Sequence, residues 1–218
     1  RQIDAINARP RVDIINGMVR LGDVVFGANK QGHIFSVDVS APDKIRLIGA
    51  RDTQELDGLE KPHDAAFCHE LLVVVSAENF GRDSSPGKLA VYRVADPKTL
   101  ETLPVDQWAL VGKLEHPRLA GANRVMTHGS LVFVGSSLAP NPSRTDDLRA
   151  NMSVVDLSDP LQPHLLGGVE FPDLQGPNGL ELAGNVVFAA GGQTVQAIDV
   201  STPFAPRELA RFTSAEVF

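Results

Sequence analysis

Four polar side chains, one in each of four similar segments, are the strongest candidates for ligand binding in this chain. They are Asn16, His63, Asn123 and Asn178. Amide and imidazole groups can each donate and accept hydrogen bonds, so the set suits a polar ligand. The residues that follow add charge of both signs, because Asp64 and Arg124 stand where the other two segments have glycine.

Oxygen atoms of the same residues could instead hold a hard divalent cation. Calcium binds amide and carboxylate oxygens, which makes Asn123, Asn178 and Asp64 candidate metal ligands. His63 would then act as the general base on a metal-polarised water or substrate. The charge balance weakens this interpretation, because Asp64 is the only acid at its register and the next segment has an arginine there.

The segments that carry these residues predict β-hairpins. Each begins with a short strand-like run, reaches a turn of the type Gly-Asp, His-Glu, Gly-Ser or Gly-Asn, and continues into a run rich in Val, Leu and Phe. A third run ends in a phrase whose Asp, Ser and Pro suit a turn, at residues 37–42, 155–160 and 198–203. Fourth strands are predicted to begin near Arg46, Leu110, His164 and Arg207.

The four segments start near residues 16, 63, 123 and 178, at intervals of roughly 50 residues that suit a four-stranded propeller blade. We therefore predict an all-β fold, a β-propeller of four-stranded antiparallel blades, in which residues 1–218 form one domain. A β-sandwich would not impose repetition at this period. Residues 1–15 are interpreted as an outer strand and linker from a preceding blade, or as a strand that pairs with an edge elsewhere. Four visible blades then make the chain an excerpt of a larger ring.

Alternating strand direction places the candidate residues on one face of the propeller. The leading ends of the first strands and the loops between second and third strands share this face, which we call the ring face. The loops of the second and third units are long and polar, and they add Arg82, Asp83 and Arg144 as candidate ligand contacts. The alternative is structural: polar residues also line water-filled channels, Asn forms local turns, and His63 could be satisfied by a neighbouring blade.

Composition excludes several other classes of function. A net charge of -7 and the lack of a basic cluster argue against a nucleic-acid partner. No apolar run approaches the roughly 20 residues of a membrane-spanning helix. The single cysteine, Cys68, excludes an internal disulfide and a cysteine-based zinc site.

The Asp-Val-Ser-x-Pro phrase at residues 37–42, followed by Leu-x-Gly, resembles the LVIVD-repeat β-propeller proteins. The second unit departs from the pattern, since residues 93–97 read Arg-Val-Ala-Asp-Pro. This resemblance implies a propeller from an extracytoplasmic protein, secreted, periplasmic or at the cell surface, and it transfers no catalytic residue. Separately, residues 176–180 resemble a segment of gluconolactonase and senescence-marker-type propellers, which bind a divalent metal through such an asparagine.

The main functional prediction is a non-catalytic module that presents the ring face to a protein or glycan partner and needs no cofactor. It is favoured because the chain has no Gly-x-Ser-x-Gly elbow and no spacing that suggests a Ser-His-Asp set. The alternative is a metal-dependent hydrolase of the lactonase type with a calcium-like ion in the central channel. A lyase or redox propeller is a third class that the residues leave open.

Overall fold

Runs rich in Val, Leu and Phe form the strands of this protein, and the fold is all-β apart from short helical turns. The structure is a computed structural model that describes residues 13–78, 85–138, 149–171 and 176–214. The described chain forms four antiparallel sheets of four strands each, and within every sheet the strands follow sequence order. We call these sheets blades 1 to 4.

The blades divide the chain as follows. Blade 1 contains β1 (Ile15–Leu21), β2 (Val24–Asn29), β3 (His33–Asp38) and β4 (Arg46–Asp52). Blade 2 contains β5 (Pro62–Cys68), β6 (Leu71–Ser76), β7 (Gly87–Arg93) and β8 (Ala109–His116). Blade 3 contains β9 (Ala122–His128), β10 (Leu131–Ser136), β11 (Asn151–Asp156) and β12 (His164–Glu170). Blade 4 contains β13 (Gly179–Ala183), β14 (Val186–Gly191), β15 (Thr194–Asp199) and β16 (Arg207–Thr213).

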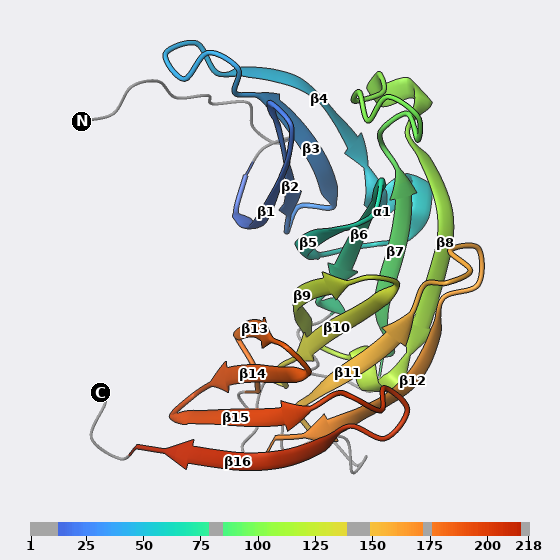
Figure 1. Cartoon of the computed structure of the whole chain (residues 1–218). Helices are drawn as coiled ribbons and strands as arrows, with labels where there is room; N and C mark the ends of the chain where they lie inside the picture. The colour runs from blue at the N-terminus through green and yellow to red at the C-terminus, as the bar shows by residue number, and fades with distance from the viewer. Residues whose placement is uncertain (1–12, 79–84, 139–148, 172–175, 215–218) are drawn as a thin grey trace.

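The blades stand side by side in an open arc (Figure 1). β1, β5, β9 and β13 line its concave side, and β4, β8, β12 and β16 form its outer side, with the opening between blades 1 and 4. The predicted fold class is confirmed. The strand proposed before residue 13 lies outside the described residues. In the described ranges, no helix is long and apolar enough to span a membrane.

Two-residue turns join the first two strands of every blade. Gly22, Gly129 and Gly184 have φ angles of 55°, 57° and 60°, and His69 has 54° at the same place in blade 2. Tight hairpin turns need this left-handed backbone, which glycine adopts without steric cost. The predicted hairpins are therefore confirmed, including the one whose turn lacks glycine.

The repeated Asp-x-Ser phrase forms the turn after the third strand. Asp38 Oδ1 accepts hydrogen bonds from the backbone N–H of Ser40 at 2.9 Å and from its hydroxyl at 2.6 Å. Asp156 and Ser158 repeat both contacts at 2.8 and 2.7 Å. The Ser40 hydroxyl is the largest cause that lowers the pKa of Asp38 to about 2. These turns lie on the face opposite the ring face.

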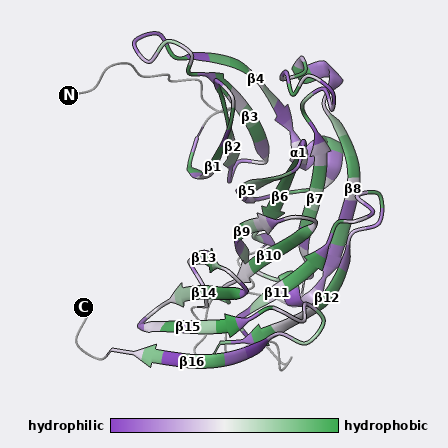
Figure 2. Ribbon diagram, in the orientation of Figure 1, coloured by the Kyte–Doolittle hydropathy of each residue, from purple (hydrophilic) through white to green (hydrophobic). Residues whose placement is uncertain are grey.

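Apolar side chains fill the layers between neighbouring blades, and hydrophobic residues run along the strands of all four (Figure 2). Phe26 of blade 1 is fully buried and meets Phe67 of blade 2 edge to face, with ring centroids 5.4 Å apart. Trp108 packs against the same ring at 5.6 Å. Each buried aromatic or branched side chain in such a layer contributes about 1.5–3 kcal/mol.

A short helix, α1 (Thr53–Asp57), joins blade 1 to blade 2 and was not predicted. Asp52 caps it by accepting the N–H of Glu55, and Gly58 ends it with a φ of 73°. At its last residue, Asp57 is buried and receives two hydrogen bonds from Arg51, at 2.8 and 2.7 Å. Tyr92 of blade 2 donates a third at 3.1 Å, so this carboxylate links the two blades on the outer side of the arc.

The residues just after the candidate ligands determine how closely the inner strands approach. Gly17 of blade 1 faces Asp64 of blade 2, and a Cβ atom on Gly17 would lie 2.0 Å from Asp64 Oδ1 and 2.6 Å from its Cα. Gly179 occupies the same register in blade 4, where a Cβ would meet nothing within 4 Å. Only the first glycine is required by packing.

We predict that Gly17→Ala lowers the free energy of unfolding by about 1–3 kcal/mol, because the added methyl overpacks the layer between blades 1 and 2. Gly179→Ala is the matched control and should change it by less than about 0.5 kcal/mol. Urea unfolding followed by circular dichroism measures both. Equal effects of the two substitutions would contradict the packing argument.

Candidate functional site

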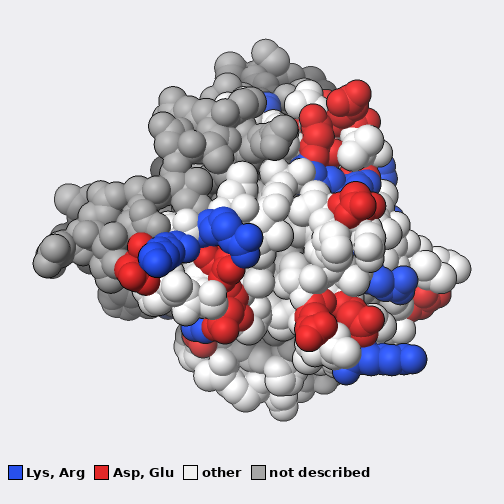
Figure 3. Space-filling view, turned by 90° about the horizontal axis from the view of Figure 1, so that it is seen from above, with Lys and Arg blue, Asp and Glu red and all other residues white. Residues whose placement is uncertain are grey.

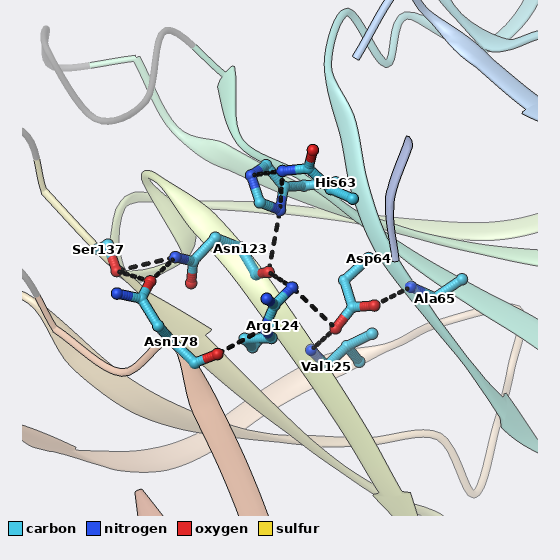
Figure 4. Close-up of polar contacts among 9 residues, drawn as sticks. His63, Asp64, Ala65, Asn123, Arg124, Val125, Ser137 and Asn178 are labelled. Atoms are coloured by element: carbon cyan, nitrogen blue, oxygen red, sulfur yellow. Dashed lines mark hydrogen bonds and ion pairs between the residues drawn. The ribbon is translucent and has the colours of Figure 1, made fainter. Parts of the chain in front are cut away.

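The four predicted ligand residues lie next to one another on the ring face. The side-chain amide of Asn16 contacts His63 Nε2 at 2.7 Å, and His63 Nδ1 lies 3.0 Å from the backbone carbonyl of Asn123. Asn123 Nδ2 donates to Asn178 Oδ1 at 2.6 Å. One residue from each blade thus joins a continuous line of hydrogen bonds, which we call the polar arc; three of its members are labelled in Figure 4.

His63 occupies the middle of the polar arc as a neutral ring. Since Asn16 Nδ2 can only donate, Nε2 accepts, and Nδ1 carries the proton that it donates to the Asn123 carbonyl. Burial first, and then the positive charges of Lys30 and Arg124, lower the pKa of His63 from its ordinary value of 6.5 to about 4. Both ring nitrogens therefore contact the neighbouring blades at neutral pH.

Asp64 lies beneath the polar arc, between blades 2 and 3. Its Oδ1 accepts the backbone N–H of Ala65 at 3.0 Å, and its Oδ2 accepts that of Val125 at 3.0 Å. Burial raises the pKa of this carboxyl, although both hydrogen bonds and Arg124 act in the opposite direction. Asp64 connects two blades, and 9% of the residue is exposed. Its contact with a ligand stays a prediction.

Arg124 extends from blade 3 toward blade 4. Its Nε donates to the backbone carbonyl of Asn178, and its Nη1 donates to that of Asn123 at 3.2 Å. Nη1 also lies 4.0 Å from Asp64 Oδ2, and 36% of the side chain is exposed (Figure 4). Arg124 is therefore held in place by protein atoms and still presents its positive charge to solvent.

Lys30 was not predicted but belongs to the same site. It directly follows β2, and its pKa is lowered first by burial and then by the positive charge of Arg124. Extending the repeat alignment would have found it: Ala77 and Ser137 hold the same register in the next two blades. Ser137 also touches the polar arc, because its hydroxyl accepts from Asn123 Nδ2 at 3.0 Å.

The residues predicted to bind calcium do not fit a divalent cation. Both oxygens of Asp64 and the side-chain oxygen of Asn178 already accept hydrogen bonds. Asn123 Oδ1 is the one oxygen of the predicted set that is buried without a partner. Among the described residues, no group of three or more His, Cys, Asp or Glu could hold a metal ion, and the nearby charges of Lys30 and Arg124 are repulsive to one.

A second feature of the ring face lies over blade 2. It is a hollow of about 190 Å³ lined by Glu60, Glu78, Ser85, Pro86, Lys88 and Glu115. Glu78 is buried and accepts from the Ser76 hydroxyl at 2.6 Å, with Lys88 Nζ 3.7 Å away. Of the predicted loop contacts, Arg82, Asp83 and Arg144 all lie outside the described residues.

The surface drawn from above the arc carries acidic and basic groups close together, separated by wide uncharged areas (Figure 3). Among the described residues on that face, Lys and Arg do not merge into one extended basic patch. The net charge of the protein is -7, so the neighbouring cations Lys30 and Arg124 stand against an acidic overall balance.

No protein-family model and no curated protein matches the chain. Among solved structures, the chain is similar to the computationally designed protein Ika4, with a TM-score of 0.57 and 12% identity over 90% of this chain and 96% of that one. The fold is a β-propeller. Designed Ika8 gives a TM-score of 0.50 and 13% identity over 81% of this chain and 42% of its own. Sqt1 of Saccharomyces cerevisiae gives a TM-score of 0.56 and 13% identity, over 93% of this chain and 47% of its own.

The chain thus spans nearly all of Ika4 but less than half of Ika8 and of Sqt1. At such low identity the likeness shows the fold alone. The propeller explains why one residue per blade meets at the polar arc, and the chemistry of that arc has to be argued from its own side chains.

We predict that His63 makes the protein acid-sensitive. Folding lowers its pKa from 6.5 to about 4, so the unfolded chain binds the proton more tightly than the folded chain. The free energy of unfolding is therefore highest above pH 6.5 and falls as the pH drops toward 4. His63→Asn, which restores the residue found in the other blades, should remove a loss on the order of 2 kcal/mol at pH 4.5 relative to pH 7.5.

The measurement is urea unfolding at both pH values, with His69→Asn in an exposed turn as the matched control. Other acid-sensitive groups, including His116, whose pKa burial also lowers, act equally in all three proteins and cancel in the comparison. A wild-type pH dependence that His63→Asn leaves unchanged would contradict the assignment.

Proposed function

We propose that this chain is a non-catalytic binding module of the LVIVD-repeat type that presents its ring face to a protein or glycan partner outside the cytoplasm. The observation that carries the proposal is the polar arc with its local positive charge. Four residues from four blades are bonded into one polar surface. Burial first, and then neighbouring positive charges, lower the pKa values of His63 and Lys30.

The same observation suggests the chemistry of the ligand. Exposed amide groups can bond hydroxyl and carbonyl groups, and Asn178 is the exposed member of the arc. Arg124 adds a guanidinium whose position is already determined by two backbone carbonyls, so little side-chain entropy is lost on binding. A partner that carries carboxylates, such as an acidic glycan, matches this combination better than a neutral or a cationic one.

The site argues less well for catalysis. A general base must have a nitrogen available to the substrate, whereas both nitrogens of His63 already bond to neighbouring blades. The alternative function, a metal-dependent hydrolase of the lactonase type, is favoured by one observation, the buried and unpartnered Oδ1 of Asn123. One free oxygen beside two cationic side chains is a poor site for calcium.

A glycan array that carries neutral and carboxylate-bearing glycans tests the main proposal. Wild-type protein should bind carboxylate-bearing glycans, and Arg124→Ala should weaken that binding at least about tenfold, because it removes a charge-assisted hydrogen-bond donor. Arg93→Ala, on the opposite face at the end of β7, is the matched control and should bind like wild type. Binding that is indifferent to carboxylates, or equal loss in both variants, would overturn the proposed ligand class.

Calcium titration separates the two functions. We expect the melting temperature to stay unchanged up to millimolar calcium, since both oxygens of Asp64 and the side-chain oxygen of Asn178 already accept hydrogen bonds and Lys30 and Arg124 repel a cation. If calcium raises the melting temperature and Asn123→Ala abolishes the rise, the hydrolase alternative replaces the binding module. Thermal unfolding with magnesium as a second cation controls for general ionic effects.

A further inference from the structure

The outward face of blade 4 is apolar and exposed. Phe188 on β14, Val195 on β15 and Phe212 on β16 are 42%, 39% and 66% exposed. Strand pairing places them together, since Val195 lies opposite Phe212 on the neighbouring strand. Figure 2 shows hydrophobic segments on the same three strands at the open end of the arc.

The repeat identifies this surface as an interface between blades. Phe188 holds the register of Phe26 in blade 1 and Phe133 in blade 3. Those two phenylalanines are 0% and 1% exposed, because each packs against the blade that follows it. Blade 4 therefore carries, in Phe188, the phenylalanine that fills the apolar layer between neighbouring blades. Among the described residues, no further blade covers it.

Blade 4 also departs from the repeat in one charged residue on this face. Glu181 lies directly opposite Phe188 in the strand register and is exposed. The equivalent residues Val19, Ala66 and Met126 are apolar, and each packs in the layer toward the following blade. An acidic residue in this layer would need a basic partner on the blade that covers it.

Blade 1 carries that basic residue at the matching register. Arg20 is equivalent to Phe67, Thr127 and Leu182, which all face the preceding blade. In blade 1 this position points out of the arc, and 65% of the Arg20 side chain is exposed, next to an equally exposed Asp23 at 3.1 Å. Met18, two residues earlier on the same face, is 63% exposed.

The contact between blades 1 and 2 shows how these positions would meet. There Phe26 touches Phe67, with ring centroids 5.4 Å apart, and Val19 lies beside Phe26. At the two ends of the chain, Phe188 takes the place of Phe26, and Glu181 that of Val19. Arg20 of a following blade takes the place of Phe67. Arg20 would then lie over the ring of Phe188 and next to Glu181. That arrangement gives an ion pair and a cation–π contact in one layer.

We propose that two copies of this chain associate head to tail, with blade 4 of each packed against blade 1 of the other, to close a ring of twice four blades. A head-to-tail interface closes only if the rotation between copies fits. The arc in Figure 1 is open, and the chain covers 42% of Ika8 and 47% of Sqt1, although it covers 96% of Ika4.

Closure would also extend the polar arc. Within the chain, each member of the arc bonds the equivalent residue of the next blade. In the closed ring Asn178 of one copy stands beside Asn16 of the partner copy, so the ring face holds two identical arcs around one channel. The proposal does not depend on what ligand the arc binds.

Sedimentation equilibrium of the 218-residue protein tests the association. The expected mass is twice 23.3 kDa. Phe188→Lys should raise the dimer dissociation constant at least about tenfold, because a charge replaces a buried ring. Leu161→Lys is the matched control, since Leu161 is 67% exposed in a turn away from both end faces, and it should leave the mass unchanged.

A charge exchange tests the orientation of the two copies. Arg20→Glu or Glu181→Arg alone places like charges together and should weaken the dimer at least about tenfold. The double variant restores opposite charges and should return the dissociation constant to within about threefold of wild type. Circular dichroism checks that every variant is folded.

Three outcomes would overturn the proposal. One is a monomer at all concentrations up to about 100 µM, far above the dissociation constant of a specific interface of this kind. Another is a mass that keeps growing with concentration, which means an open chain of copies. The third is a dimer that Phe188→Lys leaves intact and in which the double charge variant gives no recovery.

Discussion

The fold depends on apolar burial between the faces of neighbouring blades. Each four-stranded sheet is hydrophobic on both sides, so no blade can bury its core alone and each needs a neighbour. Phe26 against Phe67 shows the interaction in its simplest form. Separating two blades therefore costs the free energy of exposing the apolar layer between them. The outward face of blade 4 also needs a neighbour, because Phe188 there has the register of Phe26.

The polar arc is a consequence of that packing. When blades stack in register, equivalent residues at the leading ends of the inner strands come within hydrogen-bonding distance, and a buried polar group in such a place must find a partner. Hydrogen bonds join Asn16, His63, Asn123 and Asn178 across three blade boundaries, and only Asn123 Oδ1 of this described set is buried without a partner. Arg124 keeps 36% of its side chain exposed beside this network.

The repeat in the sequence predicted the strands and turns within each blade. Hairpin turns, Asp-x-Ser turns and the fourth strands follow from short patterns, and the face that carries Asn16 and its equivalents follows from strand direction. Contacts between blades were harder to foresee. The hydrogen bond from the backbone of blade 3 to Asp64 was not predicted. Lys30 was missed because its effect depends on Arg124, which is two blades away. The cap of α1 was visible as Asp52 and Glu55, but a single turn of helix has little periodicity to detect.

His63 connects the protonation of the polar arc to the packing of the blades. As a neutral ring it accepts from Asn16 and donates to blade 3, so it joins three blades in the middle of the polar arc. A proton on Nε2 would remove the acceptor that Asn16 uses and would add a third positive charge beside Lys30 and Arg124. Protonation of His63 at low pH would therefore disturb both the polar arc and the contact between blades. Burial is the main reason that the histidine stays uncharged at neutral pH, and the nearby charges of Lys30 and Arg124 act in the same direction.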